Sequence, residues 1–243
     1  MKATPDKLPR PARLVGKSAV VTGASRGIGL AIADALENEG CFVFAAFRTI
    51  SGKSRPPKTD HRKLLPCDVR RERSVARLFA EVKRRLPRLD FLINNAGIAH
   101  PLHHIENMPF DIWRDVLDTN LTGMFLCTRA ALPMMGRGGV IVNNLSVAAR
   151  AVFPGESAYC ASKYGALGLT ETLREELRSR GIRVLSLLPG PTATGIWDQF
   201  MPEAPRNKMM SPDTVARVVV ETLCLPENSS VEEIRMGPTE GNL

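Results

Sequence analysis

The sequence predicts a single α/β domain with a doubly wound, mostly parallel sheet of seven strands and helices on both faces. Short apolar runs alternate with longer segments of helical periodicity from one end of the chain to the other, and this alternation is typical of βαβ units. A glycine-rich turn follows the first apolar run, as in α/β domains that bind phosphate at a helix N-terminus. The 243 residues, 44% of them hydrophobic, are enough to bury one such core.

Seven apolar runs are expected to form the strands. Buried parallel strands read as continuous apolar segments because helices cover both of their faces, and the run Val140-Ile141-Val142 has this property. The expected strands are Ser18–Thr22, Cys41–Phe47, Lys63–Cys67, Phe91–Asn94, Val140–Leu145, Ile182–Leu188 and Val231–Met236.

Longer segments have the periodicity of helices that cover such a sheet: Gly27–Asn38, Ser74–Arg85, Asp111–Ala131, Ser157–Ser179 and Pro212–Leu223. Ser211 supplies an N-cap before Pro212, which suits the first helical position. The polar segment Thr49–Arg62 contains two prolines and is expected to be a loop where many such folds place a helix. We expect residues 14–243 to form the domain and residues 1–13 to be a flexible leader.

Composition argues against a membrane or secreted protein. No apolar run approaches the roughly 20 residues that span a bilayer, and the N-terminal segment lacks the apolar core of a secretory signal. The five cysteines are widely spaced, with no C-x-x-C pair, which indicates reduced thiols. We therefore expect a cytoplasmic protein without a membrane partner.

The net charge of +8 comes from one segment. Residues Arg48 to Arg88 include 14 Lys or Arg and 4 Asp or Glu, a local balance of +10. Such a segment attracts nucleic acid, an acidic carrier protein or a phosphorylated cofactor, unless it is a solvated helix face. A binder of single-stranded nucleic acid would interleave aromatic residues with the charges, and Phe79 is the only aromatic residue in the segment. We therefore expect no nucleic-acid partner.

The glycine-rich turn from Thr22 to Gly29 has the spacing G-x-x-x-G-x-G. Glycines allow a tight turn and a close backbone approach, and the helix that follows directs its N-terminus at a pyrophosphate. Residues 23–27 also match the G-x-S-x-G nucleophile elbow of serine hydrolases. That reaction needs a histidine late in the chain, and the last one is His104. The turn also follows the first strand, which leaves no earlier strand for an oxyanion-hole loop. The hydrolase interpretation is therefore disfavoured.

A tyrosine and a lysine are placed for acid–base chemistry. Tyr159 and Lys163 are spaced i, i+4 and so share one face of a predicted helix. Free tyrosine has a pKa near 10, and a neighbouring ammonium is expected to lower that pKa by roughly 1–3. Ser146 closes a predicted strand thirteen residues before Tyr159, at the strand end where open α/β sheets bind ligands.

Taken together, these motifs resemble the short-chain dehydrogenase/reductase family of Rossmann-type enzymes. The resemblance covers about Leu14 to Met236 and rests on Thr22-Gly23-x-x-x-Gly27-x-Gly29, Asn94-Asn95-Ala96-Gly97, Asn120, Ser146, Tyr159-x-x-x-Lys163 and Pro189-Gly190, in the family's order and spacing. It implies an oxidoreductase that interconverts a ketone or aldehyde and an alcohol with NADP(H). It also implies a homodimer or homotetramer that pairs through the helices Asp111–Ala131 and Ser157–Ser179.

The resemblance assigns roles to single residues. Tyr159 would exchange a proton with the substrate oxygen, and Ser146 would hydrogen-bond the same atom. Lys163 would hold the nicotinamide ribose and lower the pKa of the tyrosine, while Asn120 would anchor a water in a proton relay. Asp68 would bind the adenine amino group. No metal is implied, and the implied cofactor-binding set is Gly23, Ser25, Arg26, Gly27, Ile28, Gly29, Arg48, Asp68, Val69, Asn94, Ala96, Gly97, Tyr159, Lys163, Pro189, Gly190, Thr192 and Thr194.

Two arginines favour NADP(H) over NAD(H). In NAD-specific relatives an acidic residue at the end of the second strand binds the adenosine ribose. Here that position is Phe47, followed by Arg48, and no Asp or Glu lies between Gly40 and Thr59. Arg26, inside the glycine turn, is expected to project toward the same 2′-phosphate.

Three features qualify the assignment of activity. The ending Ile234–Thr239 lacks the Val-Asp-Gly-Gly-like segment of many 3-oxoacyl-[acyl-carrier-protein] reductases. That activity is therefore the second interpretation, and a catalytically idle NADP(H)-binding regulator is the third.

Residues 100–104 include three histidines and are expected to form a loop at the active site or a subunit contact, not a metal site. Ile196, Trp197, Phe200 and Met201 are expected either to pack in the core or to form an apolar lid on the substrate pocket.

Overall fold

The structure is a computed structural model that describes residues 11–48 and 59–241. Its strands form one parallel sheet in the order β3-β2-β1-β4-β5-β6-β7, which confirms the predicted fold class. The strands are β1 (Ser18–Thr22), β2 (Phe42–Phe47), β3 (Arg62–Pro66), β4 (Phe91–Asn94), β5 (Val140–Asn144), β6 (Arg183–Pro189) and β7 (Glu233–Met236). Most of the loop predicted at Thr49–Arg62 falls outside the described residues.

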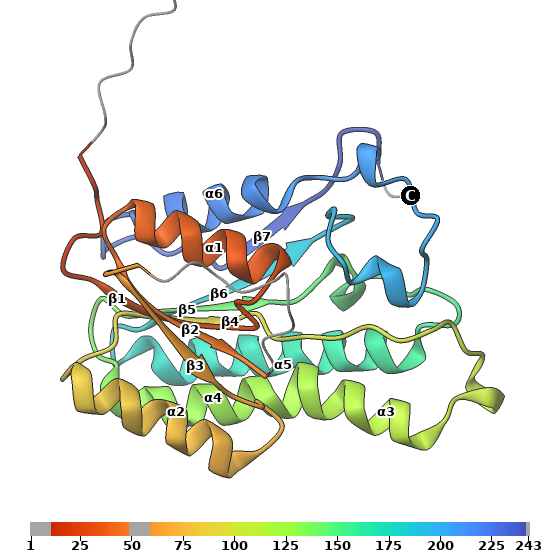
Figure 1. Ribbon diagram of the computed structural model, residues 1–243, viewed down its shortest axis with the longest axis horizontal. Helices are drawn as coiled ribbons and strands as arrows, with labels where there is room; N and C mark the ends of the chain where they lie inside the picture. The colour runs from red at the N-terminus through yellow and green to blue at the C-terminus, as the bar shows by residue number, and fades with distance from the viewer. Residues whose placement is uncertain (1–10, 49–58, 242–243) are drawn as a thin grey trace, which may run out of the picture.

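Helices cover both faces of this sheet (Figure 1). Helices α1 and α6 lie on one face, and α2, α4 and α5 lie on the other. The α-helices are α1 (Gly27–Asn38), α2 (Glu72–Arg85), α3 (Phe110–Leu117), α4 (Gly123–Ala131), α5 (Ser157–Arg178) and α6 (Pro212–Leu223). Among the described residues, no helix is both long enough and apolar enough to span a membrane.

The alternation of side chains along each strand explains why the strand sequences are apolar throughout. In β1, Ala19 and Val21 belong to the core under α1 and α6, whereas Val20 belongs to the core over α2, α4 and α5. All three are fully buried. Successive residues of a strand point to opposite faces, so a strand covered on both sides needs an apolar residue at every position.

The predicted helix Asp111–Ala131 is wrong as one continuous α-helix. The structure divides it into α3, a π-helical turn over Asp118–Thr122, and α4. A π-helical turn inserts an extra residue into the helix, a feature that often marks functional sites. Close packing accompanies it here, since a Cβ at Gly123 would lie 2.7 Å from Cγ2 of Val69. The other predicted helices and strands agree with the structure to within two residues at each end.

The end of the predicted leader is tied to the domain. Arg13 donates to Glu39, just after α1, and to Glu221 on α6, with N···O distances of 2.7 Å to each carboxylate. One guanidinium therefore joins the two helices of the same layer. The rest of the predicted leader, residues 1–10, lies outside the described residues.

Candidate active site

A cavity of about 480 Å³ opens at the carboxyl ends of the central strands. The chain crosses from β3 to β4, on the other side of β1, so the strand order reverses at β1 and β4. Such a reversal leaves a crevice in which open α/β sheets bind their ligands. Most of the predicted site residues line this cavity: Gly23, Ser25, Arg26, Gly27, Ile28, Arg48, Asp68, Val69, Ala96, Gly97, Ser146, Tyr159, Lys163, Pro189, Gly190, Thr192 and Thr194.

The glycine turn presents backbone to the cavity. Gly23 and Gly27 have φ of +66° and +57°, in the left-handed region that glycine adopts without a steric penalty. A Cβ at Gly23 would lie 2.8 Å from Cα of Ala96, so this turn approaches the end of β4 closely. The N-cap residue of α1, Arg26, makes no side-chain capping hydrogen bond. Free N–H groups and the helix dipole make this end of α1 suitable for an anion.

Gly29 has a different position from the one the motif implied. It is buried and does not line the cavity. A Cβ there would overlap the Asn95 side-chain nitrogen and the Gly23 carbonyl oxygen. Gly29 therefore allows α1 to pack against the turn after β4, and its contribution to ligand binding is indirect.

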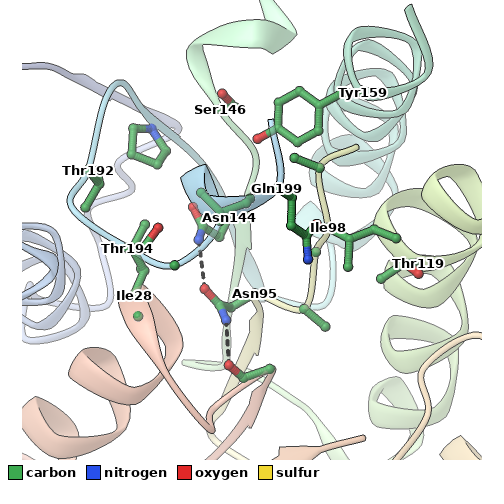
Figure 2. Close-up of a pocket in the computed structure, with 18 of the residues that line it drawn as sticks. Ile28, Asn95, Ile98, Thr119, Asn144, Ser146, Tyr159, Thr192, Thr194 and Gln199 are labelled. Carbon is green, nitrogen blue, oxygen red and sulfur yellow. Dashed lines mark hydrogen bonds between the residues drawn. The ribbon is translucent and has the colours of Figure 1, made fainter. Parts of the chain in front are cut away.

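A chain of amides joins three strand ends beneath the cavity (Figure 2). The Asn144 side chain donates to Asn95 Oδ1 at 2.8 Å, and Asn95 Nδ2 donates to the Thr22 carbonyl at 2.9 Å. The Thr22 hydroxyl accepts from the backbone N–H groups of Asn95 and Ala96 at 2.9 and 3.0 Å. These bonds fix the relative positions of β1, β4 and β5 where the cavity begins.

Asn94 does not line the main cavity, contrary to the expectation from the motif. It is buried, and its Nδ2 donates to Thr128 on α4 at 3.0 Å and to Asn143 on β5 at 2.9 Å. Asn94 and Asn95 are neighbours at the end of a strand, so their side chains point in opposite directions. Asn94 therefore joins the sheet to the helical layer.

Asn120 also lies outside the main cavity. Its Oδ1 accepts from Ile98 N–H at 2.8 Å, and its Nδ2 donates to the Ile98 carbonyl and to Ser162 Oγ, both at 3.0 Å. Both amide protons are therefore used within the protein. In this structure Asn120 holds the segment after β4 against α5, just behind the cavity wall.

Tyr159 and Ser146 lie side by side at one wall of the cavity (Figure 2). Tyr159 lies in the first turn of α5 and Ser146 follows β5, and Figure 2 shows both side chains directed at the same part of the cavity. Burial raises the pKa of Tyr159 to about 12, and the nearby Ser146 hydroxyl opposes this rise. The pKa of Tyr159 is thus raised and not lowered as expected, because desolvation of the phenol is the largest contribution.

Lys163 is buried one helical turn further along α5. Its Nζ donates to the Asn144 carbonyl at 3.2 Å and lies 5.4 Å from the centroid of the Tyr159 ring. Burial lowers the pKa of Lys163 to about 8. The cavity wall thus holds a phenol, a hydroxyl and an ammonium within one small region.

Asp68 lies at the other end of the cavity, after β3. Both of its carboxylate oxygens accept from the Arg70 guanidinium, the closest pair at 2.8 Å. The Arg70 guanidinium, together with the Arg48 charge, holds the pKa of Asp68 below its usual range. Arg70 also donates to Asp115 on α3 at 2.9 Å. Arg26 and Arg48 are exposed and line this cavity, and their contact with a ligand phosphate stays a prediction.

The segment after β6 closes the cavity from the side. Ile196, Trp197, Phe200 and Met201 all line it, and Trp197 and Phe200 stack with ring centroids 4.9 Å apart. Arg206 holds the segment by donating to the Thr194 carbonyl at 2.6 Å and to Asp198 at 2.7 Å. These four residues therefore line the cavity and do not belong to the buried core, and their action as a lid stays a prediction.

The histidine-containing segment 100–104 borders the same region. His103 pairs with Glu156 through an isolated β-bridge, and its N–H donates to the Gly155 carbonyl at 3.0 Å. His100 is buried, and its Nδ1 lies 2.6 Å from the Pro101 carbonyl. Within residues 11–48 and 59–241 no group of three potential metal ligands occurs.

Comparison with known proteins identifies the family. Residues 17–204 match the family model described as short chain dehydrogenase. The chain belongs to the short-chain dehydrogenase family. It is therefore an oxidoreductase that acts on CH–OH groups.

Relatives of this short-chain dehydrogenase are similar over most of their length. It is 34% identical to the farnesol dehydrogenase of Aedes aegypti over 239 residues, which are 93% of this chain and 97% of the relative. It is 35% identical to the 3-oxoacyl-[acyl-carrier-protein] reductase FabG of Staphylococcus aureus over 214 residues, 85% of this chain and 86% of the relative. Among solved structures, an alcohol dehydrogenase from the archaeon Thermococcus sibiricus, complexed with 5-hydroxy-NADP, superposes with a TM-score of 0.83. The sequence identity to it is 26%, and the match covers 93% of this chain and 98% of that one.

Sequence reasoning missed several residues that shape the site of this short-chain dehydrogenase. The sequence predicts Asn144 only as part of a strand and Arg70 only as one of many basic residues. Asn144 bonds to Asn95, which is 49 residues away in the sequence, and Arg70 pairs with Asp68, two residues before it. Neither spacing belongs to a motif that predicts the contact. Glu156 also lines the cavity. Its position three residues before Tyr159, on the same helical face, was a usable signal.

Proposed function

We propose that this short-chain dehydrogenase uses NADP(H) to interconvert a ketone or aldehyde and an alcohol, with Tyr159 as the general acid and base. The observation that carries the proposal is the meeting of Tyr159, Ser146 and Lys163 at one wall of the cavity. Similarity to a farnesol dehydrogenase and to an alcohol dehydrogenase complexed with 5-hydroxy-NADP supports the same class of reaction.

The residues present fit a nicotinamide dinucleotide. The uncapped N-terminus of α1 and the glycine at position 23, where a Cβ would fill the turn, would receive the pyrophosphate. Asp68 and Val69 would hold the adenine, although Arg70 already occupies both oxygens of the Asp68 carboxylate. Pro189, Gly190, Thr192 and Thr194 would line the nicotinamide end, with Lys163 at its ribose. When bound, the nicotinamide would supply or accept a hydride.

Side chains of the protein would supply the proton and stabilise the charges that its transfer creates. Burial keeps the Tyr159 phenol protonated near neutral pH, so it can donate its proton to a carbonyl oxygen as that oxygen gains negative charge. Ser146 would donate a hydrogen bond to the same oxygen, stabilising charge that develops in the transition state. The buried Lys163 ammonium lies 5.4 Å from the tyrosine ring and would stabilise the phenolate that remains.

A second candidate activity is reduction of a 3-oxoacyl thioester. The 35% identity to FabG of Staphylococcus aureus favours it. The C-terminal segment Ile234–Thr239 departs from the pattern of such reductases, so we place this activity second. A 3-oxoacyl thioester in the substrate panel would separate the two.

The decisive experiment is a carbonyl panel assayed with NADPH and with NADH, following the loss of nicotinamide absorbance. We expect turnover of at least one ketone or aldehyde, with NADPH preferred. Binding of NADPH without turnover of any carbonyl or alcohol would favour the idle regulator instead.

Two further proposals concern the oligomeric state of the enzyme and its cellular compartment. The exposed rings of Phe125 on α4 and Tyr164 on α5 support a homo-oligomer that pairs through these helices. All five cysteines are unpaired, which supports a reducing compartment such as the cytoplasm. Fractionation of the cells that produce the protein would test its location.

A further inference from the structure

One ionisable group in the cavity has no part in the reaction described above. Glu156 precedes α5, lines the cavity and is half-buried. With Tyr159 and Lys163 it falls at positions i, i+3 and i+7, so the three share one helical face. Lys163 bonds toward β5 on one side of Tyr159. Glu156 therefore lies on the other side, away from the proposed ribose.

No contact within the described part of the protein requires a carboxylate at position 156. Although Glu156 is the N-cap residue of α5, its side chain makes no capping hydrogen bond. Within the described part of the chain, no ion pair or side-chain hydrogen bond is formed by this carboxylate, and its β-bridge to His103 is made by backbone. Burial raises the pKa of Glu156, and its charge acts on Tyr159. The charge is thus close to the proposed proton donor and open to the cavity.

The part of the cavity lining that is not assigned to the cofactor is largely apolar. Phe153, Trp197, Phe200 and Met201 line the cavity with Glu156, and Gln199 adds a neutral amide. The arginines that line the cavity, Arg26, Arg48 and Arg70, come from the ends of β1, β2 and β3. The strand order separates β2 from β5 by two intervening strands, or about 14 Å at the usual spacing. Arg48 and Arg70 are therefore too far from Glu156 to neutralise it. Arg26, at the end of β1, is nearer but forms no ion pair with Glu156 in the described part of the chain.

We infer that Glu156 determines substrate specificity: the enzyme favours an apolar carbonyl or alcohol that carries a second group able to donate a hydrogen bond, a hydroxyl or an ammonium, and it disfavours carboxylates. A donor would satisfy the carboxylate, whereas a carboxylate substrate would place a second negative charge beside it. At an effective dielectric near 20, a charge about 5 Å away changes affinity by more than tenfold. This inference rests on the proposed function and specifies the substrate class for that site.

The test uses three acetophenones of similar size with a methyl, an aminomethyl or a carboxylate group in the para position. With NADPH, wild type should show a higher kcat/KM for the aminomethyl than for the carboxylate compound. Glu156→Gln should reduce that ratio by about tenfold or more. A ratio cancels any common effect of the substitution on Tyr159. The control, Glu106→Gln, changes an exposed glutamate outside the cavity and should leave the ratio unchanged.

A binding measurement separates this inference from the proposed reaction. Calorimetry with 4-methylbenzylamine and 4-methylbenzoate, with and without NADPH, needs no turnover. If wild type prefers the amine and Glu156→Gln loses the preference, the inference holds even when no ketone is reduced, and only the proposed function fails. An unchanged preference in Glu156→Gln, in turnover or in binding, would overturn the inference and leave the proposed reaction intact.

Discussion

Lys163 Nζ lies 5.4 Å from the centroid of the Tyr159 ring and 3.2 Å from the Asn144 carbonyl oxygen, buried between the helix and the sheet. Burial of this ammonium costs stability, and the cost is visible in its pKa, which falls to about 8 from an ordinary value of 10.5. The proposed role of Lys163 at the ribose would therefore come at the expense of fold stability, as is common at active sites.

Lys163→Met should stabilise the protein near pH 7 in the absence of cofactor. The pKa displacement corresponds to about 3 kcal/mol, and the lost hydrogen bond to Asn144 offsets about 1 kcal/mol of it. Between pH 8 and 10.5 the unfolded chain binds the proton that the folded chain has released, so wild-type stability rises with pH in this window. The advantage of the variant, measured by urea denaturation, should therefore shrink toward pH 10.5. If Lys163→Met is no more stable than wild type at pH 7, burial of the Lys163 ammonium does not cost stability.

Tyr159→Phe should abolish turnover and leave cofactor affinity nearly unchanged. The hydroxyl is the proposed proton donor, whereas the ring only packs, and general acid–base catalysis is typically worth 10²–10⁴-fold. Steady-state kinetics and calorimetry with NADPH measure the two quantities. Retention of more than about a tenth of the wild-type kcat would remove Tyr159 from the mechanism.

The pH dependence of the wild type gives an independent check on Tyr159. Its pKa of about 12 keeps the phenol protonated through the neutral range, which suits carbonyl reduction. Alcohol oxidation needs the phenolate and should accelerate as pH rises. Rates measured in both directions should therefore diverge between neutral and alkaline pH. An oxidation rate that does not respond to pH would count against the tyrosine.

Gly29→Ala should destabilise the fold and weaken cofactor binding together. The added methyl group would meet the Asn95 amide and the Gly23 carbonyl, and overpacking of this kind costs about 1–3 kcal/mol. Gly136→Ala is the matched control, because nothing lies within 4 Å of its Cβ position and its φ is not positive. Denaturation curves and NADPH titrations should separate the two variants. Equal behaviour would mean that the turn tolerates a side chain at this position.

Sedimentation should show a dimer or larger assembly at micromolar concentration. Phe125 on α4 and Tyr164 on α5 are 43% and 44% exposed, which is costly for aromatic rings unless a partner covers them. Phe125→Asp should shift the equilibrium toward monomer. Val152→Asp, at a residue 76% exposed and outside both helices, should not. A monomeric wild type would refute pairing through these helices.

The sequence predicted the fold because the strands are buried on both faces and therefore carry the signal in their own residues. Asn94 and Asn95 show where that information ends. Both stand at the end of one strand, and only the direction of each side chain decides that Asn95 belongs to the amide chain beneath the cavity while Asn94 bonds to Thr128. The π-helical turn Asp118–Thr122 depends similarly on contacts with distant segments, Ile98 and Ser162 among them. The hydrophobic periodicity of the sequence does not predict contacts between such distant segments.

The last prediction concerns the choice between NADP(H) and NAD(H). Arg26 and Arg48 are exposed at the cavity, and Arg48 lies close enough to Asp68 to lower its pKa. Arg48 is therefore at the proposed adenosine end. Charge-assisted hydrogen bonds contribute roughly 1.5–3 kcal/mol each. Allowing for screening of exposed groups, two of them would give about 2–4 kcal/mol, or a preference for NADPH of about 30- to 1000-fold.

The double variant Arg26→Ala, Arg48→Ala tests this assignment through kcat/KM for both cofactors. Because NADH lacks the 2′-phosphate, the variant should lose activity with NADPH and retain most of its activity with NADH. A control, Arg73→Ala with Arg77→Ala, removes two exposed arginines of α2 that do not line the cavity. It changes the net charge equally, so it accounts for long-range attraction of the more anionic cofactor. A wild type that uses both cofactors equally, or a double variant that keeps its preference, would place the 2′-phosphate on other residues.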